Sequence, residues 1–230
     1  MDEINVKICG LKHENDVRLC MDLGVNILGF VTEYPIQVPW NLTRKETLPL
    51  LKMVKPPFRS CIVTGGPCEK IIDLATYLRP DIVQLHYKET LEDTKIICDS
   101  LQKLNIDVIK TVPPKIEDRI SQFNTSDIEI IVEKLCKCGV YGLLADSRTP
   151  SNASLKGCET DLDFCKQILK FSSKPVIIAG GINAENVINI LKNTGAKFID
   201  VMTGVESIPG EKDIKKLSAL LTESRGRQTV

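Results

Sequence analysis

The feature that most constrains the fold is a regular alternation of short apolar runs with longer amphipathic segments along the chain. Each run is about four to six residues long, as expected for parallel strands that are buried on both faces. Between the runs, apolar residues recur at three- and four-residue spacing, which is typical of helices that cover a sheet. The predicted strands are 5–9, 26–31, 59–63, 81–86, 107–112, 141–145, 175–179 and 198–202.

Capping signals mark the ends of several helices. Thr43 precedes Arg-Lys-Glu, and Thr125-Ser-Asp precedes an isoleucine-rich stretch with Glu129 near its third position. Both patterns are typical of a helix start, because a hydroxyl can accept a hydrogen bond from a free backbone N–H of the first turn. Helix ends are predicted at Gly24, Gly139 and Gly195, since glycine readily adopts the left-handed conformation found there.

Eight strand–helix units fill the 230 residues and leave no segment for a second domain. An open doubly wound sheet uses the same alternation, but usually with about five or six strands. Eight units therefore favour a closed (β/α)8 barrel, or TIM barrel, an α/β fold that residues 1–230 form as a single domain. The longest irregular stretches, 32–42 and 147–160, follow strands two and six and are expected on the carboxyl-end face, where barrel active sites lie.

Composition excludes several classes of protein. Hydrophobic residues make up 43% of the chain and charged residues 26%, as in an ordinary globular protein. The 30 basic residues balance the 30 acidic ones, so the overall charge gives no reason to expect a nucleic acid or a membrane as partner. The N-terminus resembles no secretory signal and no apolar run is long enough to span a membrane, so a cytoplasmic location is expected.

The cysteines do not suggest a disulfide scaffold or a metal site. There are nine of them, an odd number, without a C-x-x-C pair, and only two histidines accompany them. Buried apolar thiols are the commoner state of such cysteines, so no metal is expected. The assembly is expected to be a monomer or a homodimer.

Glycines follow the last two predicted strands and indicate a phosphate site. Strand seven ends in Ala179-Gly180-Gly181, and strand eight ends in Thr203-Gly204. Glycine lets backbone N–H groups approach a phosphate closely, and many barrels bind phosphate at these two loops. Each glycine run alone is better explained by a turn, and the two together favour phosphate.

A lysine and a cysteine alternate at the end of strand one. Lys7 and Cys9 are two residues apart, so their side chains point to the same face of the strand. If that face is the barrel interior, the ammonium would favour a thiolate at Cys9, which could then act as base or nucleophile. The alternative is a buried thiol beside a lysine held in a structural ion pair.

Two further strand ends carry polar residues. Asp146 closes strand six, where a carboxylate could serve as an acid or base or could cap the following turn. Gln84 and His86 share one face of strand four, and such a histidine is more often a satisfied hydrogen-bonding residue than a catalytic one.

In this order along the chain, these motifs resemble those of the phosphoribosylanthranilate isomerase family. The resemblance runs from residue 7 to residue 213, and the opening K-I-C-G and the closing G-V-E-x-x-P-G-x-K-D are its most specific parts. The matching segments are Lys7–Gly10, Gly29–Val31, Val83–His86, Leu143–Asp146, Ala179–Ile182, Glu185–Val187 and Thr203–Asp213.

The resemblance implies an isomerase of tryptophan biosynthesis that catalyses an Amadori rearrangement of N-(5′-phosphoribosyl)anthranilate, a small phosphorylated sugar conjugate. It implies that Asp146 is the general acid that protonates the furanose ring oxygen and that Cys9 is the general base that removes the C2′ proton. Lys7, Gln84 and His86 would contact the substrate. Such a reaction requires neither a redox cofactor nor a metal.

The chain departs from the family pattern where the aglycone should bind. The family carries Ser-Pro-Arg or Ser-Lys-Arg after strand two, and its arginine meets the anthranilate carboxylate. Residues 32–40 contain no cation here, and Arg44 and Arg148 are the candidate replacements. An arginine that pairs with a carboxylate through two hydrogen bonds is not easily replaced by neutral groups.

A second departure follows strand six, where the family has Gly-Gly-Thr-Gly. This chain has Lys156-Gly157-Cys158-Glu159 instead, and Tyr87 replaces a glycine after strand four. These changes leave two alternatives open. One is a paralogous barrel isomerase acting on another phosphorylated sugar conjugate, and the other is a non-catalytic barrel that binds a phosphate ligand.

Overall fold

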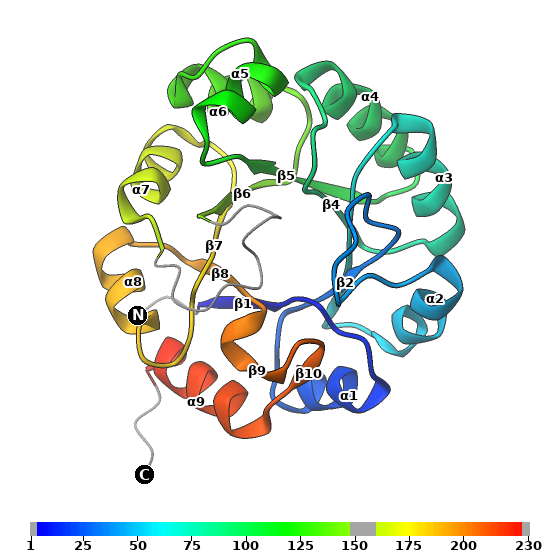
Figure 1. Cartoon of the computed structure of the whole chain (residues 1–230), viewed down its shortest axis with the longest axis vertical. Coiled ribbons are helices and arrows are strands. Elements are labelled where there is room, and N and C mark those ends of the chain that lie inside the picture. Colours follow the sequence, from blue (N-terminus) through cyan, green and yellow to red (C-terminus); the bar gives the residue numbers. More distant parts are fainter. Residues whose placement is uncertain (1–3, 148–159, 227–230) are drawn as a thin grey trace.

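Eight parallel strands close into a barrel in which each strand pairs with its neighbours in sequence and β8 pairs with β1 (Figure 1). The computed structural model describes residues 4–147 and 160–226. Every predicted strand is confirmed, with ends that shift by at most one residue. The strands are β1 Asn5–Ile8, β2 Ile27–Val31, β3 Arg59–Thr64, β4 Ile82–Leu85, β5 Asp107–Val112, β6 Gly142–Asp146, β7 Val176–Ala179 and β8 Phe198–Val201.

Helices surround the barrel as an outer ring (Figure 1). They are α1 Glu14–Asp22, α2 Arg44–Met53, α3 Cys68–Leu78, α4 Leu91–Gln102, α5 Ile116–Phe123, α6 Ile128–Lys137, α7 Leu162–Phe171, α8 Val187–Thr194 and α9 Ile214–Arg225. None of the described helices is both long and apolar enough to cross a bilayer. Two additions interrupt the simple repeat. First, both α5 and α6 lie between β5 and β6. Second, a short 3-10 turn and an antiparallel hairpin separate β8 from α9; they are η2 Thr203–Val205, β9 Glu206–Ile208 and β10 Glu211–Lys212.

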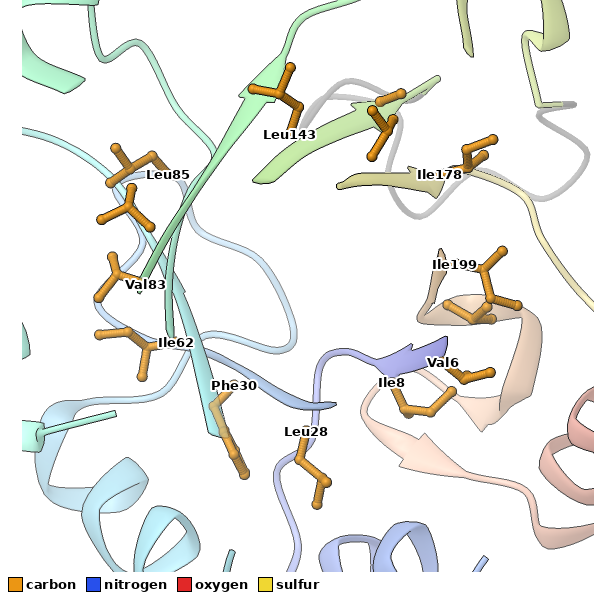
Figure 2. Packing of buried hydrophobic residues seen from close by; sticks show 14 of the residues in the cluster. Val6, Ile8, Leu28, Phe30, Ile62, Val83, Leu85, Leu143, Ile178 and Ile199 are labelled. Atoms are coloured by element: carbon orange, nitrogen blue, oxygen red, sulfur yellow. The ribbon is translucent and has the colours of Figure 1, made fainter. Parts of the chain in front are cut away.

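Alternation along the strands divides the apolar residues into an outer and an inner set. The outer set packs under the helices as one continuous core, and Figure 2 shows its members on the sides of the strands that face the helices. On β1 and β2 these residues include Val6, Ile8, Leu28 and Phe30, all fully buried. The intervening residues point into the barrel, so the position of a residue in a strand decides whether it can reach the barrel interior.

The capping predictions hold with one correction. Thr43 and Glu46 form a capping box at the start of α2, and Gly195 ends α8 with a φ of 69°. For α6, however, the N-cap is Asp127 rather than Thr125, because the Asp127 carboxylate accepts from the Ile130 N–H. The Thr125 hydroxyl instead accepts from the Asp127 N–H and so shapes the approach to the helix.

Candidate active site

The carboxyl ends of the strands enclose a cavity of about 110 Å³. Its lining brings together residues from β1, β4 and β6 and from the loops after β7 and β8, which are far apart in the sequence. The predicted site residues on its wall are Cys9, Gln84, His86, Asp146, Gly180, Gly181, Thr203 and Gly204. Lys7 is not on this wall, and Arg148 lies outside the described residues, as do Lys156 and Glu159.

A larger hollow of about 480 Å³ lies at the opposite, amino-end face. Its charged lining includes Arg59, which pairs with Asp107 at 2.6 Å and stacks over the Tyr141 ring. Among the residues that the structure describes, its wall has no cysteine, histidine or carboxylate. The candidate site is therefore the smaller cavity, which holds the cysteine, the histidine and the carboxyl groups and lies on the face where barrel enzymes carry out catalysis.

Lys7 and Asp200 form a buried ion pair across neighbouring strands. They are register partners on β1 and β8, and the Lys7 Nζ donates to Asp200 Oδ2 at 2.8 Å. Burial alone would lower the pKa of Lys7, but the Asp200 carboxylate outweighs it and holds the pKa above its ordinary value. The ammonium is therefore permanently charged and already paired.

Cys9 continues the same face beyond the end of β1 and is almost fully buried. Burial raises the pKa of this thiol above its ordinary value, and the nearby Lys7 charge only partly opposes that effect. Of the two alternatives left open by the sequence, the free protein shows the buried thiol beside a lysine held in an ion pair. Burial is the main cause, and Asp200 adds to it because it pairs with the ammonium that would otherwise favour a thiolate.

Gly29 on β2 leaves the space that Cys9 and Lys7 occupy. A Cβ atom at this position would lie 3.0 Å from the Lys7 Nζ and 3.1 Å from the Cys9 Sγ. Any side chain there would displace both groups. The glycine of the G-F-V motif is therefore needed for the shape of the site rather than for a turn.

His86 lies between Gln84, Thr111 and Asp146. Its Nδ1 is 3.2 Å from Gln84 Nε2 and 3.0 Å from Thr111 Oγ1, and its Nε2 is 3.5 Å from Asp146 Oδ2. Burial lowers the pKa of His86 to about 4, so the ring is neutral at neutral pH. Since the Gln84 amide donates to Nδ1, the single ring proton belongs on Nε2, where it faces Asp146.

Two acceptor atoms on the cavity residues have no partner among the described atoms. They are Gln84 Oε1 and Asp200 Oδ1, both buried. An unsatisfied buried acceptor is costly, typically about 1–3 kcal/mol. The cavity is therefore suited to a ligand that carries hydroxyl or amine donors.

The glycine loops after β7 and β8 touch each other. A Cβ at Gly204 would lie 1.9 Å from the Ile182 carbonyl oxygen, and a Cβ at Gly180 would lie 3.0 Å from Asp146 Oδ1. Gly180 and Gly181 also have positive φ angles of 96° and 74°. These glycines are required by close approach and backbone conformation, so together they form a backbone-lined corner beside Asp146.

Of the two cations proposed to replace the missing arginine, only Arg44 can be placed, and it does not line the cavity. Arg44 begins α2, where its guanidinium pairs with Glu33 at 2.8 Å and with Asp73 at 2.7 Å. Arg148 lies outside the described residues. Among residues 4–147 and 160–226, no lysine or arginine lines the cavity, and no three His, Cys, Asp or Glu side chains are placed to bind a metal.

Sequence reasoning missed part of the wall. Asp200 escaped notice because a single carboxylate in an apolar strand gives no hint that a lysine 193 residues away will pair with it. Tyr34, Val38 and Met202 line the cavity through tertiary folding of their loops, and no local pattern indicates that. Asp200 lies two residues after Phe198, so both side chains point into the barrel. This alternation was the one available signal for Asp200.

A closed eight-stranded barrel with a thiol, a carboxylic acid and two touching glycine loops at its carboxyl end defines a TIM-barrel enzyme. Comparison with known proteins gives the family. The family model described as N-(5'phosphoribosyl)anthranilate (PRA) isomerase matches residues 6–223, and the chain belongs to this family. The resemblance, the isomerase class and the barrel fold predicted from the sequence are thereby confirmed.

Individual relatives agree with the family model. The chain is 29% identical to the N-(5'-phosphoribosyl)anthranilate isomerase of Methanocaldococcus jannaschii, with 96% of each chain covered. It is 27% identical to that of Methanosarcina acetivorans, with 96% of this chain and 92% of the relative covered. The crystal structure of the Thermus thermophilus phosphoribosyl anthranilate isomerase superposes with a TM-score of 0.76 at 25% identity, covering 96% of this chain and 98% of that one.

Proposed function

We propose that the cavity isomerises N-(5′-phosphoribosyl)anthranilate, with Asp146 as general acid and Cys9 as general base. The observation that carries the proposal is that Cys9 and Asp146 line one small cavity together with the two glycine loops. They lie at the ends of β1 and β6, with β7 and β8 between them in the closed sheet. A sugar whose phosphate lies on the glycine loops would therefore have the acid and the base on different sides.

The chemistry follows from these positions. Asp146 gives its proton to the ring oxygen as the C1′–O4′ bond breaks, and the electrons of the nitrogen form an iminium at C1′. Cys9, as a thiolate, removes the C2′ proton, and the C2′–H electrons form the enolamine that tautomerises to the 1-deoxyribulose product. Each transfer requires its group within hydrogen-bonding reach of the reacting atom.

The raised pKa of the Cys9 thiol is compatible with this order of events. The thiol is neutral in the free protein, so its proton must pass to solvent before Cys9 can accept the C2′ proton, and ring opening places the positive charge of the iminium next to C2′. An opposite charge within about 4–6 Å favours the ionised form of a group, so the intermediate itself promotes formation of the thiolate.

The unpartnered acceptors support a sugar as ligand. Gln84 Oε1 and Asp200 Oδ1 would accept from ribose hydroxyls, which would complete their hydrogen bonding. Lys7 would act through Asp200, by holding its other oxygen at 2.8 Å. Gly180, Gly181, Thr203 and Gly204 would hold the phosphate.

The test is turnover of freshly prepared phosphoribosylanthranilate by the purified protein at neutral pH. We expect isomerisation above the uncatalysed rate, and loss of it in Cys9→Ala with binding of a reduced product analogue retained. Cys136→Ala is the matched control, because this half-buried thiol lies on α6 beside Ser172. Full activity of Cys9→Ala would remove the thiol from the mechanism.

A second candidate is an isomerase that uses the same acid and base on another phosphorylated sugar conjugate. It is favoured by the lack of a cation on the described cavity wall. A folded protein that binds inorganic phosphate but does not isomerise phosphoribosylanthranilate would select this candidate. In either case we place the enzyme in the cytoplasm, as a monomer or a homodimer.

A further inference from the structure

One side of the cavity is a separate apolar cluster built around Cys9. We call it the aromatic wall and define it as Val31, Tyr34, Val38, Trp40, Val63 and Met202. It forms where the 32–42 loop folds back onto the barrel, held by the bridge between Thr32 and Leu42. This cluster is distinct from both the outer core and the inner barrel layer, and every one of its residues lines the cavity.

The polar atoms of its two aromatic side chains are used elsewhere. The Trp40 Nε1–H donates to Glu206 Oε1 at 2.8 Å, and the Tyr34 hydroxyl donates to the His86 carbonyl oxygen at 2.7 Å. Both side chains are largely buried, Trp40 with 2% of its surface exposed. The wall therefore offers only carbon and sulfur surface to a ligand, which suits a flat apolar group.

The cations near the 32–42 loop are engaged away from the cavity. Lys12 donates to the Pro39 carbonyl oxygen at 2.8 Å, and Lys70 donates to the Gly65 carbonyl oxygen at 2.9 Å. Arg44 is held by two carboxylates, as described above. The charged groups that do line the cavity, among the described residues, are the carboxyl groups of Asp146 and Asp200. An aryl carboxylate would gain no charge pairing from this wall.

Glu206 fixes Trp40 in place. One carboxylate oxygen, Oε1, accepts from the indole N–H, from Lys212 Nζ at 2.7 Å and from the Gly210 N–H at 3.2 Å. The ring is confined on its other side, where a Cβ on Gly10 would lie 2.8 Å from Trp40 Cδ1. A carboxylate with three donors is a rigid anchor, because each further hydrogen bond narrows its orientation.

We propose that this enzyme recognises the aglycone of its substrate by packing against Trp40 and the aromatic wall rather than by pairing with a carboxylate. Its substrate class is then N-aryl phosphoribosylamines, with the ring required and the carboxylate dispensable. Glu206 is a positioning residue that acts through Trp40. The inference rests on the proposed isomerase function.

The direct test compares two substrates that differ only in the carboxylate. Aniline and anthranilate each condense with ribose 5-phosphate, and isomerisation of both conjugates can be followed by chromatography. We expect kcat/KM for the aniline conjugate to lie within about thirtyfold of that for the anthranilate conjugate, whereas losing a bidentate charge pair should cost more.

A preference for the anthranilate conjugate of more than about thirtyfold in kcat/KM would overturn the inference. If that preference disappears in Arg148→Ala, Arg148 is the residue that binds the carboxylate. Turnover of neither conjugate would refute the proposed function itself. Turnover of the anthranilate conjugate alone would keep the function and reject the inference, so the two failures are distinguishable.

Variants test the wall and its anchor. Trp40→Leu should raise KM for both conjugates by about tenfold with a smaller change in kcat, and Trp40→Phe should recover part of the loss. Glu206→Ala should act like Trp40→Leu, whereas Glu206→Gln keeps an acceptor for the indole and should recover part of KM, since it still removes the charge that pairs with the buried Lys212 at 2.7 Å. Glu211→Gln removes an exposed carboxylate from the same hairpin and is the matched control.

Trp40 also supplies a readout independent of turnover, because it is the only tryptophan in the chain. Binding of a reduced aniline conjugate should change its fluorescence in the wild type and in Glu206→Gln. In Glu206→Ala, the emission of the free protein should shift to the red as the indole is released. Unchanged KM values in Trp40→Leu and Glu206→Ala would overturn the assignment of the wall.

Discussion

The contact between the two glycine loops makes Gly204→Ala the sharpest test of the phosphate site. Gly204 is not among the residues with positive φ, so alanine can adopt its backbone conformation and the effect is steric. The new Cβ would start 1.9 Å from the Ile182 carbonyl oxygen and 3.0 Å from its carbonyl carbon. Since that neighbour is backbone, the β7–α8 loop must move by about 1 Å, which would separate the two loops that we propose hold the phosphate.

The expected magnitudes follow from this geometry. Overpacking of this kind costs about 1–3 kcal/mol of folding free energy, and each kcal/mol shifts Tm by about 2–4 °C in a domain of this size. In the wild type, phosphate at ten times its Kd should add about 1.4 kcal/mol, or about 3–6 °C. A hundredfold weaker Kd would leave less than about 0.1 kcal/mol of that protection at the same concentration.

The assay is thermal unfolding with and without inorganic phosphate. Gly195→Ala is the matched control: it replaces a glycine with a φ of 69° at the end of α8, and its Cβ would meet no atom within 4 Å. We expect the control to lose about 1 kcal/mol from backbone strain and to keep its full phosphate shift. A full phosphate shift in Gly204→Ala would refute the reasoning, because the site would then not depend on the contact between the loops.

Further predictions concern Cys9, the proposed base, and its surroundings. If the Cys9 thiolate is the reactive form, kcat/KM should rise with pH through the neutral range, by up to about tenfold per pH unit, because burial raises the pKa of this thiol. A pH-independent kcat/KM would contradict this prediction. Gly29→Ala should lower kcat at least tenfold, because its Cβ would lie 3.1 Å from the Cys9 Sγ. Steady-state kinetics measures the loss, and circular dichroism checks that the fold is retained. Lys7→Met should lower the free energy of unfolding, measured in urea, by about 3–5 kcal/mol, because it leaves a buried Asp200 carboxylate without its partner. A smaller loss in the double variant Lys7→Met/Asp200→Asn would confirm this cause. Burial holds the pKa of His86 at about 4 in the folded protein, against an ordinary value of 6.5, so the unfolded chain binds the proton first as the pH falls. The free energy of unfolding should therefore decrease between pH 6.5 and 4. In His86→Asn this decrease should be less steep.

The barrel strands could be predicted almost to the residue, and the reason is physical. A parallel strand covered by helices outside and by side chains inside must be apolar on both faces, so it reads as a continuous run such as VIIA in β7. The β9–β10 hairpin was not predicted. Its strands are two and three residues long, and Ser207, Ile208 and Glu211 within it are exposed, so no burial pattern marks it.

The part of the candidate site that lies at the carboxyl ends of strands could be predicted from the sequence. Cys9 and Asp146 could be placed on one face because the carboxyl ends of parallel strands converge in a closed barrel. The aromatic wall was not predictable in this way. Trp40 lies in a loop, and its position depends on Glu206, a partner 166 residues further along the chain.

The protonation state of Cys9 shows how the charge balance of the cavity bears on the proposed mechanism. Period-two alternation correctly placed Lys7 beside Cys9, but the charge that reaches the thiol also depends on Asp200, which holds the ammonium at 2.8 Å. With that pair neutral overall and His86 uncharged, the described walls have no free positive charge to stabilise a thiolate. If Cys9 is the base, as we propose, the positive charge must come from the substrate when its ring opens. A base of this kind would be inert in the empty site and active only once the reaction has begun, which would protect the thiol from oxidation and alkylation.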